Sequence, residues 1–213
     1  MVKKTKEEAL ETRNCLLDTA EQVFHRKGVS QTTLNDIAQA AGMTRGAIYW
    51  HFKNKVDLFN AMCDRVTLPL EAMTEAATRD DVADPLGELR HSVRYFFHKV
   101  VTDEHYRLVF DILFNKCEFV VELGPIVERD SRVREEFRQR FERMLLNAEK
   151  RGQLPAGLNH RLAVESYQAY VKGILRNWLL NPASFDLLVD GDRMLDAFFE
   201  LLQVSRALRP GHR

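Results

Sequence analysis

The sequence contains little of what secreted, metal-binding or membrane-spanning proteins require. Its three cysteines, Cys15, Cys63 and Cys117, have neither the CxxC nor the Cys/His spacing of a zinc site, and their odd number does not suit a disulfide framework. No apolar run approaches the ~18 residues of a membrane-spanning helix. The charged N-terminus has no apolar stretch typical of a signal peptide. We therefore expect a soluble cytoplasmic protein with no metal and no cofactor.

Glycine and proline are also scarce, with only 10 and 6 among the 213 residues, which argues against a loop-rich β fold. Apolar residues recur instead at three- and four-residue steps along most of the chain, a pattern that predicts amphipathic helices. The expected fold class is therefore all-α, with about nine helices. They should span about 6–27, 33–41, 45–50, 54–78, 85 onward, 104–119, 125–152, 159–181 and 189–206.

The chain as a whole has no excess of charge of one sign. Lys and Arg together number 31, as do Asp and Glu, so the chain is no polycation. Residues 1–55 nevertheless hold nine basic and six acidic side chains, which leaves the remainder acidic. A basic front joined to an acidic body favours a front that meets a polyanion.

The most informative motif is TLNDIAQAAGMTRGAIY, from Thr33 to Tyr49. It predicts two short helices joined by a turn at Gly42. Helices of seven to nine residues do not stand alone, so other helices must cover their apolar sides. The long helix before the motif and the helix after Asn54 can supply that cover, and this is the arrangement of a helix-turn-helix.

When the apolar positions of the second helix point inward, its outer surface carries a cation, hydroxyls and aromatic rings, and a glycine leaves one position without a side chain. Arg45 could reach guanine in a major groove, and Gly46 would let the backbone come close to the duplex. Short helix pairs also occur as plain packing units, and Tyr49 and Trp50 would then be core residues. The predicted DNA contacts, to bases or to phosphates, are Thr33, Thr44, Arg45, Gly46, Tyr49, Trp50, His51, Lys53 and Lys55.

The stretch TRGAIYWHFKNKVDLF closely resembles the DNA-binding domain of the TetR family of transcriptional regulators, and KKTKEEALETRNCLLDTAEQVFHRKGV matches that family's first helix. DPLGELR, ILFNKCEF, RGQLP and NWLLNPASFDL resemble its AcrR-like branch, the repressors of multidrug efflux pumps. The resemblance implies a homodimer that binds a palindromic operator and is released when a hydrophobic drug binds. It also implies a three-helix DNA-binding domain over residues 1–54 and a larger helical ligand-binding and dimerisation domain over 55–213.

The second region has the composition of a cavity for apolar ligands. Eleven of the 13 phenylalanines follow residue 55, and aromatic, Met and small polar residues share inward-facing helix positions. Ordinary core packing is the alternative. Glu118, Gln168 and Lys172 are polar candidates for orienting a ligand. The predicted pocket residues are Val66, Thr67, Leu70, Leu89, Val93, Phe96, Phe110, Phe114, Cys117, Phe137, Phe141, Gln168, Val171 and Leu175.

The last two long helices carry apolar faces suited to a four-helix interface between two subunits, or to the subunit's own core. The resemblance favours the dimer, with the interface residues Tyr170, Gly173, Ile174, Trp178, Phe198 and Leu202. An enzyme is disfavoured, because the seven histidines are scattered and no HExxH or GxSxG motif occurs. A helix-turn-helix protein without an inducer, and an activator in place of a repressor, remain alternatives.

Overall fold

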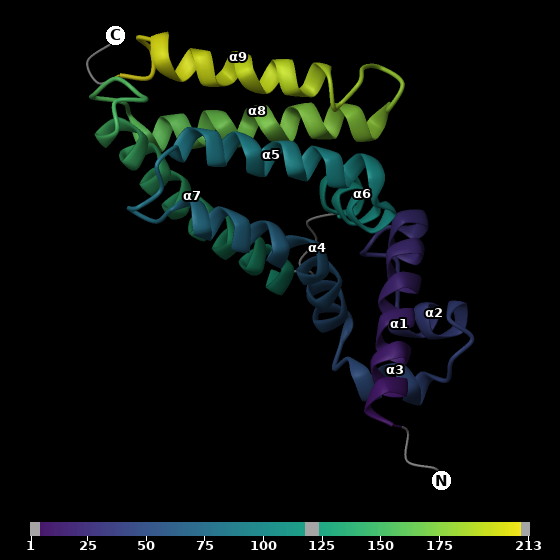
Figure 1. Ribbon diagram of the computed structural model, residues 1–213. Coiled ribbons are helices and arrows are strands. Elements are labelled where there is room, and N and C mark those ends of the chain that lie inside the picture. Colours follow the sequence, from purple (N-terminus) through teal and green to yellow (C-terminus); the bar gives the residue numbers. More distant parts are fainter. Residues whose placement is uncertain (1–4, 118–123, 210–213) are drawn as a thin grey trace. The chain divides into compact units, whose positions relative to one another are not determined.

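The computed structural model describes residues 5–117 and 124–209. Within these ranges it contains nine α-helices, one π-helix and no strand, so the all-α prediction is confirmed (Figure 1). The helices are α1 (Lys6–Lys27), α2 (Leu34–Ala40), α3 (Arg45–His51), α4 (Lys55–Ala77), α5 (Pro85–Thr102), α6 (Glu104–Asp111), the π-helix η1 (Ile112–Lys116), α7 (Gly124–Lys150), α8 (His160–Leu180) and α9 (Asp190–Val204).

The chain packs as two compact units. The first unit spans residues 1–67 and 104–130, and so combines α1, α2, α3 and the start of α4 with α6, η1 and the start of α7. The second unit spans residues 68–103 and 131–213. Packing therefore groups α6 with the helix-turn-helix, and the expected functional boundary between residues 54 and 55 remains a prediction.

α1 is the central support of the first unit. Its start is fixed by a capping box, in which the Thr5 hydroxyl accepts from the Glu8 backbone N–H and the Glu8 carboxylate accepts from the Thr5 backbone N–H. It ends at Gly28, whose φ of +81° favours glycine. The buried side chains of α1 include Leu16 and Phe24, and the helix contacts both α2 and α6. The two short helices of the motif therefore have the cover that they need.

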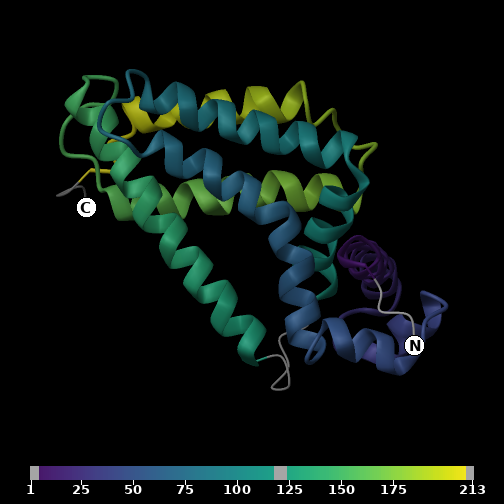
Figure 2. The same cartoon turned by 60° about the horizontal axis from the view of Figure 1, so that its bottom comes forward.

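In the second unit, α9 lies alongside both α5 and α8 (Figures 1 and 2). Nε of Arg94 on α5 donates to Oδ1 of Asp192 on α9 at 2.5 Å. The Arg90 guanidinium lies 4.7 Å from the ring centroid of Phe199, a cation–π contact between the same two helices. Leu195, Phe199 and neighbouring apolar side chains are fully buried, so this unit has a core of its own.

The helix expected over 104–119 differs from the structure. The α-helical turns end at Asp111 and continue as a π-helix to Lys116, and residues 118 and 119 lie outside the described ranges. Contacts specific to this segment accompany the change. The Asn115 side chain donates to the Asp111 carboxylate at 2.7 Å, and the Lys116 carbonyl accepts from the Val29 backbone N–H at 3.2 Å. The second contact joins positions far apart in the sequence, so helical periodicity does not reveal it.

Candidate nucleic-acid interface and effector region

The turn between α2 and α3 has the geometry that the motif predicted. Gly42 has a φ of +65°, and the Met43 backbone N–H donates to the Ala38 carbonyl at 2.9 Å, which closes the turn. Thr44 caps α3, since its hydroxyl accepts from the Ala47 backbone N–H at 3.2 Å. Each short helix therefore begins at a residue whose side chain fixes its first turn.

Thr33 begins α2 through a capping box with Asp36. The Thr33 backbone N–H donates to the Asp36 carboxylate at 2.9 Å and the Thr33 hydroxyl donates to it at 2.8 Å. These two bonds, with a smaller contribution from the Lys27 ammonium at 3.1 Å, lower the pKa of Asp36 to about 2. The predicted DNA contact Thr33 thus also has a structural task in the free protein.

α3 directs nearly all of its side chains outward. Ile48 is fully buried, whereas Tyr49 is 48% exposed and Trp50 is 73% exposed. The interpretation of Tyr49 and Trp50 as core residues is therefore wrong. The Arg45 guanidinium lies 5.4 Å from the ring centroid of Tyr49, so the cation and the aromatic ring form one surface. Large apolar rings at such exposure are typical of surfaces that contact another molecule.

Gly46 has no structural need to be glycine. A Cβ built at this position would meet only the Thr44 hydroxyl, at 3.9 Å, which is ordinary van der Waals contact. Its backbone is helical, unlike that of Gly42, whose positive φ would strain any other residue. The small side chain at position 46 is therefore consistent with the predicted close approach of DNA.

The remaining predicted DNA contacts differ in how freely their side chains can reach a phosphate. The exposed Lys53 lies just beyond the C-terminal end of α3. His51 is half-buried, and its ring stands edge-on to Trp50 with centroids 4.5 Å apart. Nζ of Lys55, in contrast, donates to the Val29 carbonyl at 2.8 Å and to the Ser30 carbonyl at 3.0 Å. These two bonds give Lys55 a role in holding α4 to the chain after α1.

The predicted pocket residues are distributed over both units. Val66, Thr67, Phe110, Phe114 and Cys117 belong to the first unit, and the other nine to the second. Phe110 and Phe114 lie with ring centroids 5.9 Å apart. Glu118 lies outside the described residues. The pocket as a whole remains a prediction.

Within the second unit, the structure brings together an aromatic cluster that includes two of the predicted pocket residues. The Phe141 and Tyr167 rings have centroids 4.2 Å apart, and the Phe137 ring is stacked on Tyr167 at 6.0 Å. Burial raises the pKa of the Tyr167 phenol. On the same helix as Tyr167, Nζ of Lys172 lies 3.4 Å from Oε1 of Gln168.

The residues expected at a subunit interface lie at different depths. Ile174, Trp178, Phe198 and Leu202 are buried within a single chain, where Phe198 contacts Tyr167 and Tyr170. Burial within one chain is what the alternative interpretation of α8 and α9 expects, and the interface remains a prediction. The other two expected residues differ, since Tyr170 is 37% exposed and a Cβ at Gly173 would meet no atom within 4 Å.

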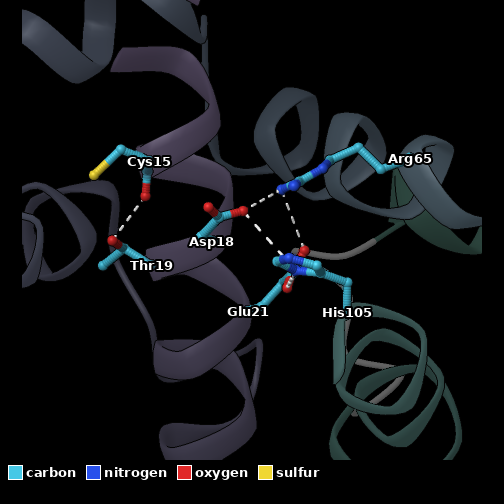
Figure 3. A network of polar contacts seen from close by, with 6 residues as sticks. All are labelled: Cys15, Asp18, Thr19, Glu21, Arg65 and His105. Carbon is cyan, nitrogen blue, oxygen red and sulfur yellow. Dashed lines mark hydrogen bonds and ion pairs between the residues drawn. The ribbon is translucent and has the colours of Figure 1, made fainter. Parts of the chain in front are cut away.

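Sequence reasoning missed a polar network of Asp18, Glu21, Arg65 and His105, which joins α1, α4 and α6 (Figure 3). Nδ1 of His105 lies 2.6 Å from Oε2 of Glu21, and an Arg65 guanidinium nitrogen lies 2.6 Å from Asp18 and 3.4 Å from Glu21. Because the Arg65 guanidinium already contacts both carboxylates, we assign no metal ion to this network. The contact between His105 and Glu21 joins residues 84 positions apart, so no local motif could have revealed it.

None of the described helices has the length and apolar character that a membrane crossing needs.

Two family models match the chain. That of bacterial regulatory proteins of the tetR family matches residues 16–62, and that of the C-terminal region of MAATS-type transcriptional repressors matches residues 84–204. The HTH-type transcriptional regulator TtgR of Pseudomonas putida is 41% identical over 209 residues, which cover 98% of this chain and 100% of TtgR.

Solved structures are similar over almost the whole chain. NalD, the secondary repressor of the MexAB-OprM multidrug efflux pump in Pseudomonas aeruginosa, superposes with a TM-score of 0.83 at 38% identity, covering 94% of this chain and 100% of NalD. The SmeT–triclosan complex superposes with a TM-score of 0.82 at 33% identity, covering 95% of this chain and 96% of SmeT. SmeT is the repressor of the Stenotrophomonas maltophilia pump SmeDEF. The chain belongs, as its N-terminal motif indicated, to the TetR family, whose members are transcriptional regulators and not enzymes.

Proposed function

We propose that this protein is a ligand-responsive repressor of a multidrug efflux operon, acting in the cytoplasm as a homodimer on a palindromic operator. The exposed surface of α3 carries the proposal, because Arg45, Tyr49 and Trp50 face outward from a helix that is fixed at its start and anchored by Ile48. A helix of this kind enters the major groove with its N-terminal residues against base edges. The efflux repressors NalD and SmeT, at TM-scores above 0.8, support the regulatory role.

The two-fold symmetry of the proposed operator requires two copies of α3, and α8 and α9 offer the surface that pairs them. Their outward positions carry apolar side chains at helical spacing, with Leu162, Tyr170 and Leu180 on α8 and Leu201 and Val204 on α9. These residues are 37–74% exposed in one chain, an apolar surface that a second copy would cover. The open space beside Gly173 would let a partner helix come close.

The dimer is tested with Leu201→Arg, which places a charge within the proposed interface. Leu146, on α7, is 42% exposed and close in exposure to Leu201 at 43%, so Leu146→Arg is the matched control. Light scattering after size exclusion should give a monomer for Leu201→Arg and a dimer for the wild type and the control. A dimer in all three proteins would contradict this interface.

The effector site is proposed around the aromatic cluster of Phe137, Phe141 and Tyr167, whose stacked rings suit an apolar, aromatic ligand. Triclosan is a reasonable first probe, since SmeT binds it. Phe137 is half-buried, so Phe137→Ala removes one wall of the cluster with less damage to the core than a change at Phe141. Calorimetric titration should show weaker triclosan binding for this variant than for the wild type.

Fluorescence anisotropy with DNA fragments tests the whole proposal. The fragments are the promoters of the protein's own gene and of neighbouring transporter genes, measured against random DNA at the same salt concentration because phosphate contacts alone give salt-dependent binding. We expect selective binding to one fragment and release on adding triclosan or another apolar drug. Selective binding that no drug changes would favour the regulator without an inducer, and increased transcription in vitro would favour the activator. No preference over random DNA would overturn the proposal.

A further inference from the structure

Both ends of α6 are joined to α1 by a contact between a histidine and a carboxylate. At the start of α6, Nδ1 of His105 lies 2.6 Å from Oε2 of Glu21. At its end, Oδ2 of Asp111 lies 3.1 Å from Nε2 of His25. The polarity is reversed between the two pairs, since α1 supplies the carboxylate of the first and the histidine of the second. Glu21 and His25 are one helical turn apart, so one face of α1 carries both contacts.

The carboxylates of both pairs are well shielded and held in place. Glu21 is 1% exposed and Asp111 is 14% exposed, whereas His105 and His25 are 47% and 40% exposed. The second Asp111 oxygen accepts from the Asn115 side chain at 2.7 Å. Each pair thus combines a fixed acceptor with an imidazole that water can reach, which lets protons exchange at the imidazole while the acceptor stays in position.

Other charged groups also face His105. Asp18 on α1 lies 3.9 Å from its Nδ1, and Arg65 on α4 contacts the same two carboxylates from the other side. Glu104, its neighbour on α6, lines a hollow of about 230 Å³ with Asp18, Glu21 and His105. Two carboxylates and one guanidinium therefore lie close to the imidazole, and this balance favours the imidazolium.

We propose that the pairs His105–Glu21 and His25–Asp111 form a proton-operated latch, here named the histidine latch, which fastens α6 to α1 when both imidazoles are protonated. An imidazolium attracts a carboxylate by its full charge as well as by a hydrogen bond, whereas a neutral imidazole keeps at most the hydrogen bond. Loss of the two protons therefore weakens both ends of α6 together. The consequence for regulation rests on the proposed function. The latch joins α1, within the region matched by the DNA-binding family model, to α6, within the region matched by the C-terminal model.

The direction of the pH dependence follows from the environment of His105. The hydrogen bond that the His105 imidazole donates to Glu21 raises the pKa of His105, with burial and Arg65 opposing. A histidine whose pKa is higher in the folded than in the unfolded state stabilises the fold below its unfolded pKa, and this contribution is lost as the pH rises through the folded value. Burial also raises the pKa of the Glu21 carboxyl, and the contacts with His105 and Arg65 oppose that shift. The His105 end of the latch is therefore closed at low pH and opens as the pH rises through the raised pKa of His105.

Hydrogen exchange of the full-length protein tests the latch without any DNA or ligand. We expect the protection factors of the α6 backbone amides, corrected for intrinsic exchange, to fall several-fold from pH 6 to pH 8 relative to those of α8. In the double variant His25→Gln/His105→Gln, the α6 amides should have the low protection factors of the pH 8 wild type at both pH 6 and pH 8. Glutamine keeps a hydrogen-bond donor and does not titrate, and both histidines are partly exposed, so the variant should fold.

The matched control is His91→Gln/His98→Gln, which removes two exposed histidines from α5 and should retain the wild-type pH dependence in α6. A histidine titration by NMR should also give His105 a pKa above the ordinary histidine value. The proposal would be overturned by a double variant that keeps the wild-type pH dependence of α6, or by a His105 pKa at or below that ordinary value.

A second measurement connects the latch to regulation. The measured quantity is the ratio of operator Kd values with and without triclosan. It should change between pH 6 and pH 8 in the wild type and stay constant in His25→Gln/His105→Gln. A proton-linked contact between α1 and α6 would change the coupling between operator binding and triclosan binding. If the wild type binds no operator, the proposed function fails and the exchange experiment still decides the latch. If the operator is bound and the ratio is equally pH-dependent in both proteins, the latch has no part in coupling.

Discussion

α3 and α6 are similar in length and opposite in how they use their side chains. α3 has seven residues with Ile48 buried, and its rings and guanidinium face solvent. α6 has eight residues, buries four of them, and is joined to α1 at both ends. Neither helix is long enough to be stable alone. The comparison teaches that a helix held by few contacts can present a recognition surface, whereas a helix held by many suits the transmission of a change.

The dependence of α3 on one anchor predicts the largest effect on stability. Ile48→Ala removes its fully buried side chain and should lower the free energy of unfolding by about 2–5 kcal/mol. Urea denaturation measures the loss. Trp50→Ala, on the same helix and 73% exposed, should change stability by less than about 0.5 kcal/mol. Equal losses in the two variants would show that α3 is held in some other way.

The proposed recognition role of α3 predicts a loss of operator binding without a loss of folding. Arg45→Ala should weaken operator binding by ~1–3 kcal/mol and relax the base preference at one position. Anisotropy titrations against a set of single-base operator variants measure both effects. Arg79→Ala, in the exposed segment between α4 and α5, is the control and should bind as the wild type does. Equal weakening of Arg45→Ala on operator and random DNA would instead identify a phosphate contact.

The start of α2 should respond to pH with the sign opposite to that of the histidine latch. Thr33→Ala removes an N-cap and should cost about 0.5–2 kcal/mol at neutral pH. The pKa of Asp36 is lowered by Thr33, so this contribution is present above the ordinary carboxyl value and is lost as the pH falls towards about 2. Thr44→Ala is the control. The first turn of α3 contains no acid, so the stability that this variant loses should not vary with pH. Denaturation midpoints between pH 2 and pH 7 provide the comparison.

The smallest effect on stability is expected at Gly46. Alanine is favoured over glycine inside a helix by up to about 1 kcal/mol, and the added Cβ meets no close atom. Gly46→Ala should therefore leave the thermal midpoint equal or slightly higher. Operator affinity should nevertheless fall, because the methyl group stands where the duplex is expected. An unchanged affinity would mean that α3 does not bring this position close to DNA.

Local patterns predicted the parts of the fold that depend on neighbours in the sequence. The caps at Thr33 and Thr44, the turn at Gly42 and the outward face of α3 follow from spacing that one or two helical turns can determine. The same reasoning treated Lys55 as a phosphate contact, because a lysine at a helix start is placed well for one. Its bonds to the Val29 and Ser30 carbonyls cross 25 residues or more and have no local signature.

The contacts between distant helices could not be predicted, because they depend on which apolar face packs against which neighbouring helix. The pattern of α8 and α9 shows that Trp178 and Phe198 point to an apolar surface, and does not show whether that surface belongs to the same subunit. Both side chains are 7% exposed or less in one chain. His105 and Glu21 illustrate the same limit for polar groups, since each is an unremarkable surface-type residue until α6 is packed against α1.

The bonds of Lys55 have a practical consequence for genetics. Its ammonium donates to two carbonyl oxygens that follow α1. These bonds connect the first turn of α4 to the loop before α2. Any substitution that removes this ammonium breaks both bonds and so weakens the contact between the two segments that flank α2 and α3. A screen that scores only derepressed colonies would report Lys55 variants whether the lost contact is one to a phosphate or the pair of bonds to these carbonyl oxygens.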